Sequence, residues 1–209
     1  MIKLVCFDLD DTLIREIHSD MLLCILNGKE REHEIIQFMD KNGMLNCIAL
    51  DSLRARLSAG LDEAAVSKRF LDVIEPLKNI AETVRELHFA GIKSIIVTVG
   101  PKQVAKAASD AWGFDGCYGS DYEVADGHFP GVIANHIDAG GKTECLKDYC
   151  SQFGILPDEC VAVGDGVTDI PLFEYCGKSV AVNTSDHVSQ KASFSISTLD
   201  LGDILQFIL

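Results

Sequence analysis

The chain has 209 residues, enough for one α/β domain with an insertion or for one domain and a small second one. Its formal net charge of −14 argues against nucleic acid or an anionic membrane surface as a partner. No apolar run approaches the roughly 20 residues of a membrane-spanning helix, and no signal peptide precedes the first predicted strand. We therefore expect a cytoplasmic protein, either a monomer or a homodimer.

The chain opens with a short apolar run, residues 4–7, which predicts a buried strand. Asp8 and Asp10 come where this strand ends, and alternate residues of a strand share a face, so we expect the two carboxylates to point the same way. Paired carboxylates repel each other unless a cation lies between them, and their oxygens suit Mg²⁺. The alternative is a polar turn in which Asp11 or Thr12 caps the next segment.

Residues 13 to about 75 lack a strand pattern and predict amphipathic helices. We expect these helices over residues 19–27, 30–41, 48–57 and 61–73. The sequence thus predicts a small helical domain, residues 15–76, inserted into a core formed by residues 1–14 and 77–209. Arg54 and Arg56 lie two residues apart on the third helix and so on different sides of it. Either one of them faces a site below the helix, or both are surface arginines.

The remainder alternates between helices and strands, a pattern typical of a doubly wound parallel sheet. We expect helices over residues 77–89, 102–112, 142–153, 169–175 and 199–209, and strands over residues 92–97, 160–163, 178–182 and 194–196. Asp126 and Gly127 predict a hairpin turn within a small flap. His128 and His136 have no evident partner in the sequence and are expected on the flap or the surface.

Polar residues come directly after several of these strands, and in parallel sheets ligands bind at the carboxyl ends of the strands. Thr98 comes between a strand and a helix N-terminus, where free N–H groups suit a phosphate. Asp165 and Asp169 come after the strand over residues 160–163. Lys142 lies near the start of a helix, where the helix dipole disfavours a cation. Either it neutralises a bound anion, or it is an ordinary exposed lysine. We expect all of these side chains at one edge of the sheet.

This set of residues can transfer a phosphoryl group. Asp8 can attack phosphorus and form an aspartyl-phosphate, while Asp10 protonates the leaving alkoxide and then deprotonates water. Mg²⁺ can cancel the repulsion between nucleophile and phosphate. Asp165 is then a metal ligand, and Asp169 is either a ligand or a hydrogen-bond acceptor that does not contact the metal directly. Thr98 and Lys142 then hold the phosphoryl oxygens.

The run Asp8-Leu-Asp-Asp-Thr resembles the first motif of the haloacid dehalogenase superfamily of phosphatases. Thr98, Lys142 and the run Gly-Asp-Gly-Val-Thr-Asp-Ile-Pro from Gly164 resemble the second, third and fourth motifs. The resemblance implies a Rossmann-like core, a helical cap that closes over the substrate, and a metal held by four aspartates, with Asp10 contributing its backbone carbonyl. It also implies that phosphate is bound by Thr98, Val99 and Lys142, and that the metal ligands are Asp8, Asp10, Asp165 and Asp169.

The insertion after the first motif resembles the phosphoserine-phosphatase-like branch of this superfamily. In that branch the last arginine of the stretch matching residues 52–56, here Arg56, grips a substrate carboxylate. A glutamate that receives the amino group is replaced by Ile17, with Glu16 beside it. The resemblance therefore implies hydrolysis of a small phosphorylated metabolite, with phosphoserine as one candidate. Two alternatives remain: a phosphotransferase or mutase that uses the same aspartyl-phosphate, and a non-catalytic protein that binds a phosphorylated ligand.

Overall fold

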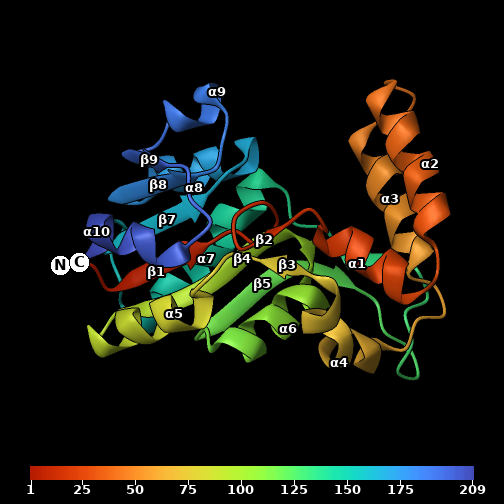
Figure 1. The fold of residues 1–209 in the computed structure, drawn as a ribbon, viewed down its shortest axis with the longest axis horizontal. Helices are drawn as coiled ribbons and strands as arrows, with labels where there is room; N and C mark the ends of the chain where they lie inside the picture. The colour runs from red at the N-terminus through yellow and green to blue at the C-terminus, as the bar shows by residue number, and fades with distance from the viewer.

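The computed structural model describes the backbone of residues 1–209 and every side chain except those of Cys47 and Ile48. A seven-stranded sheet with the order β6-β5-β4-β1-β7-β8-β9 forms its centre (Figure 1). Neighbouring strands are parallel except for β5 and β6, which pair antiparallel at one edge. The predicted α/β fold with a largely parallel sheet is confirmed. The strands are β1 (Leu4–Phe7), β4 (Lys93–Pro101), β5 (Gly116–Tyr122), β6 (Ile133–Asn135), β7 (Cys160–Gly164), β8 (Lys178–Val182) and β9 (Phe194–Ile196).

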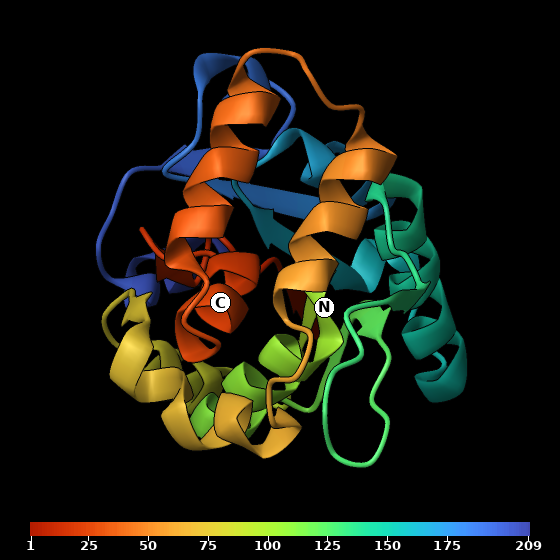
Figure 2. The same ribbon diagram turned by 90° about the vertical axis from the view of Figure 1, so that its right-hand side faces the viewer.

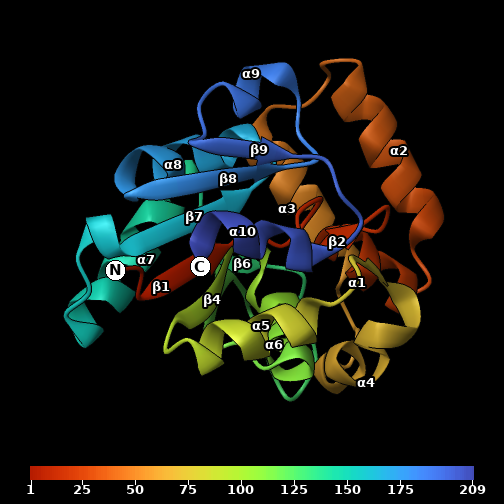
Figure 3. The ribbon, with the colours of Figure 1, turned by 60° about the vertical axis from the view of Figure 1, so that its left-hand side comes forward.

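The central strand β1 is buried on both faces, as expected for a parallel sheet between two helical layers. Val5 and Phe7 pack in an apolar core with α5 (Ile80–Phe89) and α6 (Lys102–Trp112). Leu4 and Cys6 pack in a second core, formed with two other helices. These are α7 (Ala139–Phe153) and α8 (Ile170–Tyr175), which are labelled in Figure 3. Because burying each large apolar side chain contributes about 1.5–3 kcal/mol, β1 is held firmly on both sides, and this fixes the position of Asp8 at its end.

The insertion after the first strand is helical, as the sequence predicts, and begins and ends in a small two-stranded sheet that the sequence did not reveal. This sheet pairs β2 (Ile14–Arg15) with β3 (Glu75–Pro76). The helices α2 and α3 form a hairpin that projects from the rest of the molecule (Figures 1 and 2). The four inserted helices are α1 (Ser19–Leu26), α2 (Glu30–Lys41), α3 (Cys47–Leu57) and α4 (Glu63–Val73).

The helices α1 and α4 pack against the sheet domain instead of standing apart from it. Leu22 of α1 and Phe70 of α4 belong to the same apolar core as Phe7. Phe70 also lies edge-on to Trp112 of α6, with ring centroids 5.4 Å apart. The core is therefore continuous across the boundary proposed at residues 15 and 76, and the division into two domains stays a prediction.

Several element ends differ from the sequence-based expectation. The strand expected over residues 92–97 continues as β4 to Pro101, but its register with β5 shifts between Val97 and Pro101. Thr98 thus lies in the irregular end of the strand. The C-terminal helix is shorter than expected and divides into a 3-10 turn, Leu201–Ile204, and α10 (Leu205–Ile208). The hairpin turn is present, with left-handed φ angles of 50° at Asp126 and 76° at Gly127.

Within the part of the chain that the structure describes, no helix has both the length and the apolar character needed to cross a membrane.

Candidate active site

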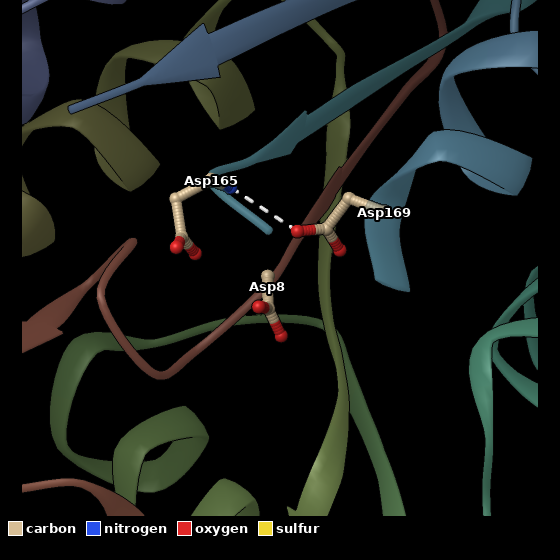
Figure 4. Close-up of side chains that lie close together, drawn as sticks. All are labelled: Asp8, Asp165 and Asp169. Carbon is tan, nitrogen blue, oxygen red and sulfur yellow. Dashed lines mark hydrogen bonds between the residues drawn. The ribbon is translucent and has the colours of Figure 1, made fainter. Parts of the chain in front are cut away.

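Three aspartates from distant parts of the sequence meet at the carboxyl edge of the sheet (Figure 4). Asp8 comes after β1 and Asp165 after β7, and these strands are parallel neighbours. Asp169 lies in the 3-10 turn Val167–Asp169 that leads into α8. One oxygen from each carboxylate lies within 4.8 Å of the other two. Strand pairing alone therefore brings residues more than 150 positions apart into one acidic group.

Asp169 is held rigidly within this group. Its Oδ2 accepts hydrogen bonds from the backbone N–H of Asp165, at 3.1 Å, and of Gly166, at 3.0 Å. The backbone of Gly164 approaches it so closely that a Cβ at this position would lie 2.3 Å from Cγ of Asp169. Only glycine fits at this position, so Gly164 leaves the space that the carboxylate of Asp169 occupies.

Lys142 enters the group from the first turn of α7 and is fully buried. Its Nζ lies 2.5 Å from Oδ1 of Asp169 and 2.9 Å from Oδ1 of Asp8. Burial lowers the pKa of Lys142, but the two carboxylates outweigh burial and hold this pKa above its ordinary value. The side chain is thus a permanent cation beside Asp8, where it can neutralise an incoming phosphate.

The acidic group fits a hard divalent cation such as Mg²⁺. The pKa of Asp8 is raised, mainly by burial and next by the charge of Asp169. Burial raises the pKa of Asp165 to about 7, although a hydrogen bond from Thr12 acts to lower it. Among the described side chains, Oδ1 of Asp8 is buried without a well-formed hydrogen bond, although Nζ of Lys142 lies near it. Three carboxylates facing one lysine leave excess negative charge, and oxygen donors of this kind suit Mg²⁺.

The carboxylate of Asp10 lies outside this group and is bound to the start of α1. Its Oδ1 accepts the backbone N–H of Ser19 at 2.7 Å and its Oδ2 accepts the Ser19 hydroxyl at 2.6 Å. Burial raises the pKa of Asp10 to about 6, and the bonds from Ser19 limit the rise. Gly100 permits this arrangement, because a Cβ there would lie 2.2 Å from Oγ of Ser19. A carboxyl group with this pKa can both donate and accept a proton near neutral pH.

The phosphate-binding residues predicted at the end of β4 lie beside the aspartates. Thr98 is buried, and its Oγ1 accepts the backbone N–H of Gly100 at 2.9 Å. Val99 borders the same cavity as Asp8, and its carbonyl accepts the hydroxyl of Ser120 at 2.7 Å. The irregular strand end therefore forms a tight turn at the edge of the sheet, close to the expected nucleophile.

This cavity, of about 230 Å³, opens between the sheet edge and the inserted helices. Asp8, Asp10 and Asp165 form part of its wall. The rest of the lining includes residues of the inserted segment and of β5, and sequence reasoning missed most of them. These residues are His18, Ser19, Asp20, Asp51, Arg54 and Tyr122.

The two cap residues predicted to contact substrate do not line this cavity. Arg56 is exposed, and Arg54 lines the cavity instead. Residues two apart on a helix point to different sides, and the buried Ala55 fixes how α3 is rotated about its axis. Glu16 is also exposed and borders a separate cavity of about 620 Å³ on the other side of Asp165. His136, expected to be unpaired, has its Nε2 2.8 Å from Oδ2 of Asp51.

Comparison with known proteins identifies the class to which this site belongs. Residues 5–174 match the model of the haloacid dehalogenase-like hydrolases, so the chain belongs to this family. A phosphoserine phosphatase from Halobacterium salinarum is 31% identical over 207 residues, which cover 97% of this chain and 96% of that protein. A substrate-bound phosphoserine phosphatase complex superposes with a TM-score of 0.81 at 27% identity, covering 99% and 98% of the two chains. The structure of a phospho-aspartyl intermediate analogue of phosphoserine phosphatase superposes with a TM-score of 0.80 at 27% identity. The match covers 99% of this chain and 98% of that one.

Proposed function

We propose that this protein hydrolyses a small phosphomonoester, with phosphoserine as the leading candidate, through a phosphoryl group carried on Asp8. The chain is a phosphatase of the haloacid dehalogenase family. One observation supports Asp8 most directly: it directly follows the central strand, its Oδ1 lies 2.9 Å from Nζ of Lys142, and two further carboxylates lie beside it. The relatives described as phosphoserine phosphatases support the choice of substrate.

In the first step a carboxylate oxygen of Asp8 attacks phosphorus, and the bond between phosphorus and the substrate oxygen breaks. Asp10 gives its proton to the leaving alkoxide, for which a pKa of about 6 leaves a useful protonated fraction near neutral pH. The ammonium of Lys142 and the turn formed by Thr98 and Val99 hold the phosphoryl oxygens. The products are the free alcohol and a phosphorylated Asp8.

In the second step water attacks phosphorus and the bond to the Asp8 oxygen breaks. Asp10, now ionised, accepts a proton from this water and returns to its starting state. Inorganic phosphate leaves the cavity.

Asp8, Asp165, Asp169 and the backbone carbonyl of Asp10 are the groups proposed to hold Mg²⁺. When bound, the cation draws electron density from the phosphoryl oxygens and offsets the repulsion between the phosphate and Asp8. Thr12 supports this role, because its hydroxyl binds Oδ1 of Asp165 at 2.9 Å and so fixes the direction of that carboxylate.

Substitution of the nucleophile tests this mechanism. In Asp8→Asn we expect no phosphate release from phosphoserine or from an aryl phosphate with Mg²⁺ present, while circular dichroism and melting temperature stay close to the wild type. Trapping of phosphate on the wild-type chain, lost after mild alkali, reports the intermediate. Turnover in Asp8→Asn at the wild-type rate contradicts the covalent route.

The two alternative functions give different products in the same assay. A phosphotransferase or mutase passes the phosphoryl group to an added alcohol faster than to water, whereas a non-catalytic binding protein releases no phosphate at all. We expect release of inorganic phosphate to dominate in the presence of serine or glycerol.

A further inference from the structure

Three cysteines gather at the edge of the sheet opposite the aspartates. Cys150 lies on α7, Cys160 begins β7, and Cys176 directly follows α8. The sulfur atoms of Cys150 and Cys160 are 3.5 Å apart, and the Cys176 thiol donates a hydrogen bond to Cys160. The sequence gives no hint of this cluster, because the chain contains no Cys-x-x-Cys pair.

The turn before β7 and the end of α8 approach each other closely, and this places Cys176 beside Cys160. The backbone N–H of Gly177 donates to the carbonyl of Pro157 at 2.9 Å. A Cβ on Gly177 would lie 2.7 Å from Cα of Asp158, so only glycine fits at this position. The contact between the two thiols is therefore fixed by the backbone around them.

A group of thiols can hold a soft metal ion or form a disulfide. Among the described side chains, the aspartates form the only group of three or more possible ligands whose atoms all lie within 4.8 Å of one another. The three thiols are thus too widely spaced for a compact metal site. Cys150 and Cys160, by contrast, need to approach by only about 1.5 Å to reach the length of a disulfide bond.

We propose that this cluster is a site of oxidation by peroxide, in which Cys160 attacks the oxidant, Cys150 closes a disulfide with it, and Cys176 is a positioning residue. In the first step the thiolate of Cys160 attacks one oxygen of hydrogen peroxide and the O–O bond breaks. The sulfur becomes a sulfenic acid, and the hydroxide that leaves takes up the proton that Cys160 has lost.

In the second step the sulfur of Cys150 attacks the sulfenic sulfur of Cys160, and the S–O bond breaks. The leaving hydroxide takes up the proton of the Cys150 thiol. Two thiols and one peroxide molecule thus give one disulfide and two water molecules. The peroxide is reduced, the two sulfur atoms are oxidised, and no further reactant is needed.

Cys160 lies just below the surface of the molecule. The residue itself is fully buried, but Cys176 is only half-buried, and Leu156 and Asp158 in the turn before β7 are exposed. Hydrogen peroxide is little larger than water, so local opening of this turn admits it. A bulky oxidant requires a much larger opening.

The neighbours of Cys160 favour its thiolate. A hydrogen bond from Cys176 lowers the pKa of Cys160 and, with a smaller contribution from Cys150, outweighs the opposite effect of burial. The same hydrogen bond, and then burial, raise the pKa of Cys176, so that Cys160 is the better nucleophile of the two. The other groups that face Cys160 are the carbonyl of Leu156, the Lys3-paired carboxylate of Glu159, the Tyr175 hydroxyl and the Cys6 thiol.

The cluster joins the same three elements that form the proposed active site. At the carboxyl edge of the sheet, α7 carries Lys142, β7 leads to Asp165, and α8 follows Asp169. At the opposite edge the same three elements bring the cysteines together. A disulfide between α7 and β7 therefore constrains two of the elements that hold the proposed catalytic groups.

Mapping of disulfides in the full-length wild-type chain tests the inference. The reduced protein is treated with hydrogen peroxide, its remaining thiols are alkylated, and it is cleaved before aspartates, which lie between each pair of the three cysteines. Mass spectrometry should show a peptide that links Cys150 to Cys160, absent after reduction with dithiothreitol. In 8 M urea the same treatment should spread oxidation over the eight cysteines of the chain, because the fold no longer selects a pair.

Three variants separate the roles of the cysteines. Cys150→Ala should leave a sulfenic acid on Cys160, which dimedone traps. Cys176→Ala should slow disulfide formation by about 10-fold at pH 7, the effect of about one pKa unit on the thiolate fraction, and displace its pH dependence upward. Cys176→Ser should restore most of the rate, because a hydroxyl donates the same hydrogen bond. A purely structural role of Cys176 would not move the pH dependence.

Cys117→Ala is the matched control, because it removes a partly exposed thiol from β5 and should leave the rate within about twofold of the wild type. Oxidation of the folded wild type confined to Cys117 and Cys145, or a link from Cys160 to Cys176 in place of Cys150, overturns the assignment. Disulfide formation at the wild-type rate in Cys176→Ala overturns the positioning role. Mapping in the wild type decides the site even where a variant fails to fold, and no readout depends on phosphate release, so the proposed function is tested separately.

Discussion

The two walls of the cavity are built in different ways. On the sheet side, Asp8, Lys142 and Asp169 are almost fully buried and are fixed by strand pairing, backbone hydrogen bonds and one another. On the helix side, Asp51 and Arg54 are partly exposed, and each contacts a side chain from a separate element. The sheet wall is therefore rigid and suited to chemistry, whereas the helix wall can vary without disturbing the fold, which makes it the natural place for substrate choice.

Chelation of divalent cations should stop the chemistry that we propose for the sheet wall and leave the structure of the helix wall unchanged. We expect excess chelator to stop phosphate release and added Mg²⁺ to restore it. Asp165→Asn, which replaces one carboxylate oxygen of a proposed Mg²⁺ ligand with an amide nitrogen, should raise the Mg²⁺ concentration for half-maximal rate by at least about 10- to 100-fold, the cost of an outer-shell substitution at a metal site. Titration calorimetry of Mg²⁺ binding checks the same shift without turnover. Full activity in chelator contradicts the carboxylate–Mg²⁺ arrangement.

Replacing the buried cation should affect both activity and stability. Lys142→Met keeps the length of the side chain but leaves Asp8 and Asp169 facing each other without a positive charge. We expect kcat/KM to fall by about 10²- to 10³-fold, the usual cost of losing one donor to a developing anion. Breaking a buried pair also destabilises by about 3–5 kcal/mol, which urea unfolding measures. Lys147→Met, which removes an exposed lysine on the same helix, is the control and should change neither quantity.

A smaller effect should result from filling the space behind Asp169. In Gly164→Ala the new methyl group would lie 2.3 Å from Cγ of Asp169, so the carboxylate must shift. We expect a loss of about 1–3 kcal/mol in the free energy of unfolding and a weaker Mg²⁺ affinity. Gly140→Ala is the matched control, because its nearest neighbour would lie at an ordinary 3.4 Å and alanine favours the helix there. Equal stability of the two variants contradicts the tight packing around Asp169.

The same contrast explains which parts of the site could be predicted from the sequence. Asp8 and Asp165 come after apolar runs, and parallel strands bring their carboxyl ends to one edge whatever the details of packing. The sequence could not distinguish Arg54 from Arg56, because the choice depends on how far α3 is rotated about its axis. That rotation is fixed by tertiary contacts such as the burial of Ala55. The pairing of His136 with Asp51 joins two elements whose docking no local pattern encodes.

The fold shows a similar division between local and tertiary signals. The strand alternation and the helical insertion were visible as periodic patterns, and both are present. The extension of β4 to Pro101 was not visible in the sequence, because Gly100 and Pro101 are typical of the end of a strand. The β2–β3 pair was also missed, because two strands of two residues each carry no periodicity and depend on the chain returning from the insertion.

On the helix wall, Asp20 orients Arg54, whose Nε lies 3.0 Å from Oδ2 of Asp20. Burial raises the pKa of Asp20, but the hydrogen bond from His33 and the charges of Arg54 and His33 together hold this pKa below its ordinary value of 3.8. A depressed carboxyl pKa means that the folded state binds fewer protons than the unfolded state. The contribution of Asp20 to stability is therefore complete above pH 3.8 and declines as the pH falls through the lower, folded-state value.

Comparing wild type with Asp20→Asn therefore measures how firmly the helix wall is held. At pH 7 we expect the variant to be less stable by about 1–3 kcal/mol, since Arg54 and His33 lose a charged acceptor. The difference should shrink in urea unfolding at about pH 3 to 4, because Asp20 is then protonated in more of the wild-type unfolded chains. Asp110→Asn, which affects an exposed ion pair with Lys106, should show almost no difference at either pH. If the gap between wild type and Asp20→Asn is the same at both pH values, Asp20 contributes by packing alone, and Arg54 is oriented by the shape of the cavity instead of by its charge.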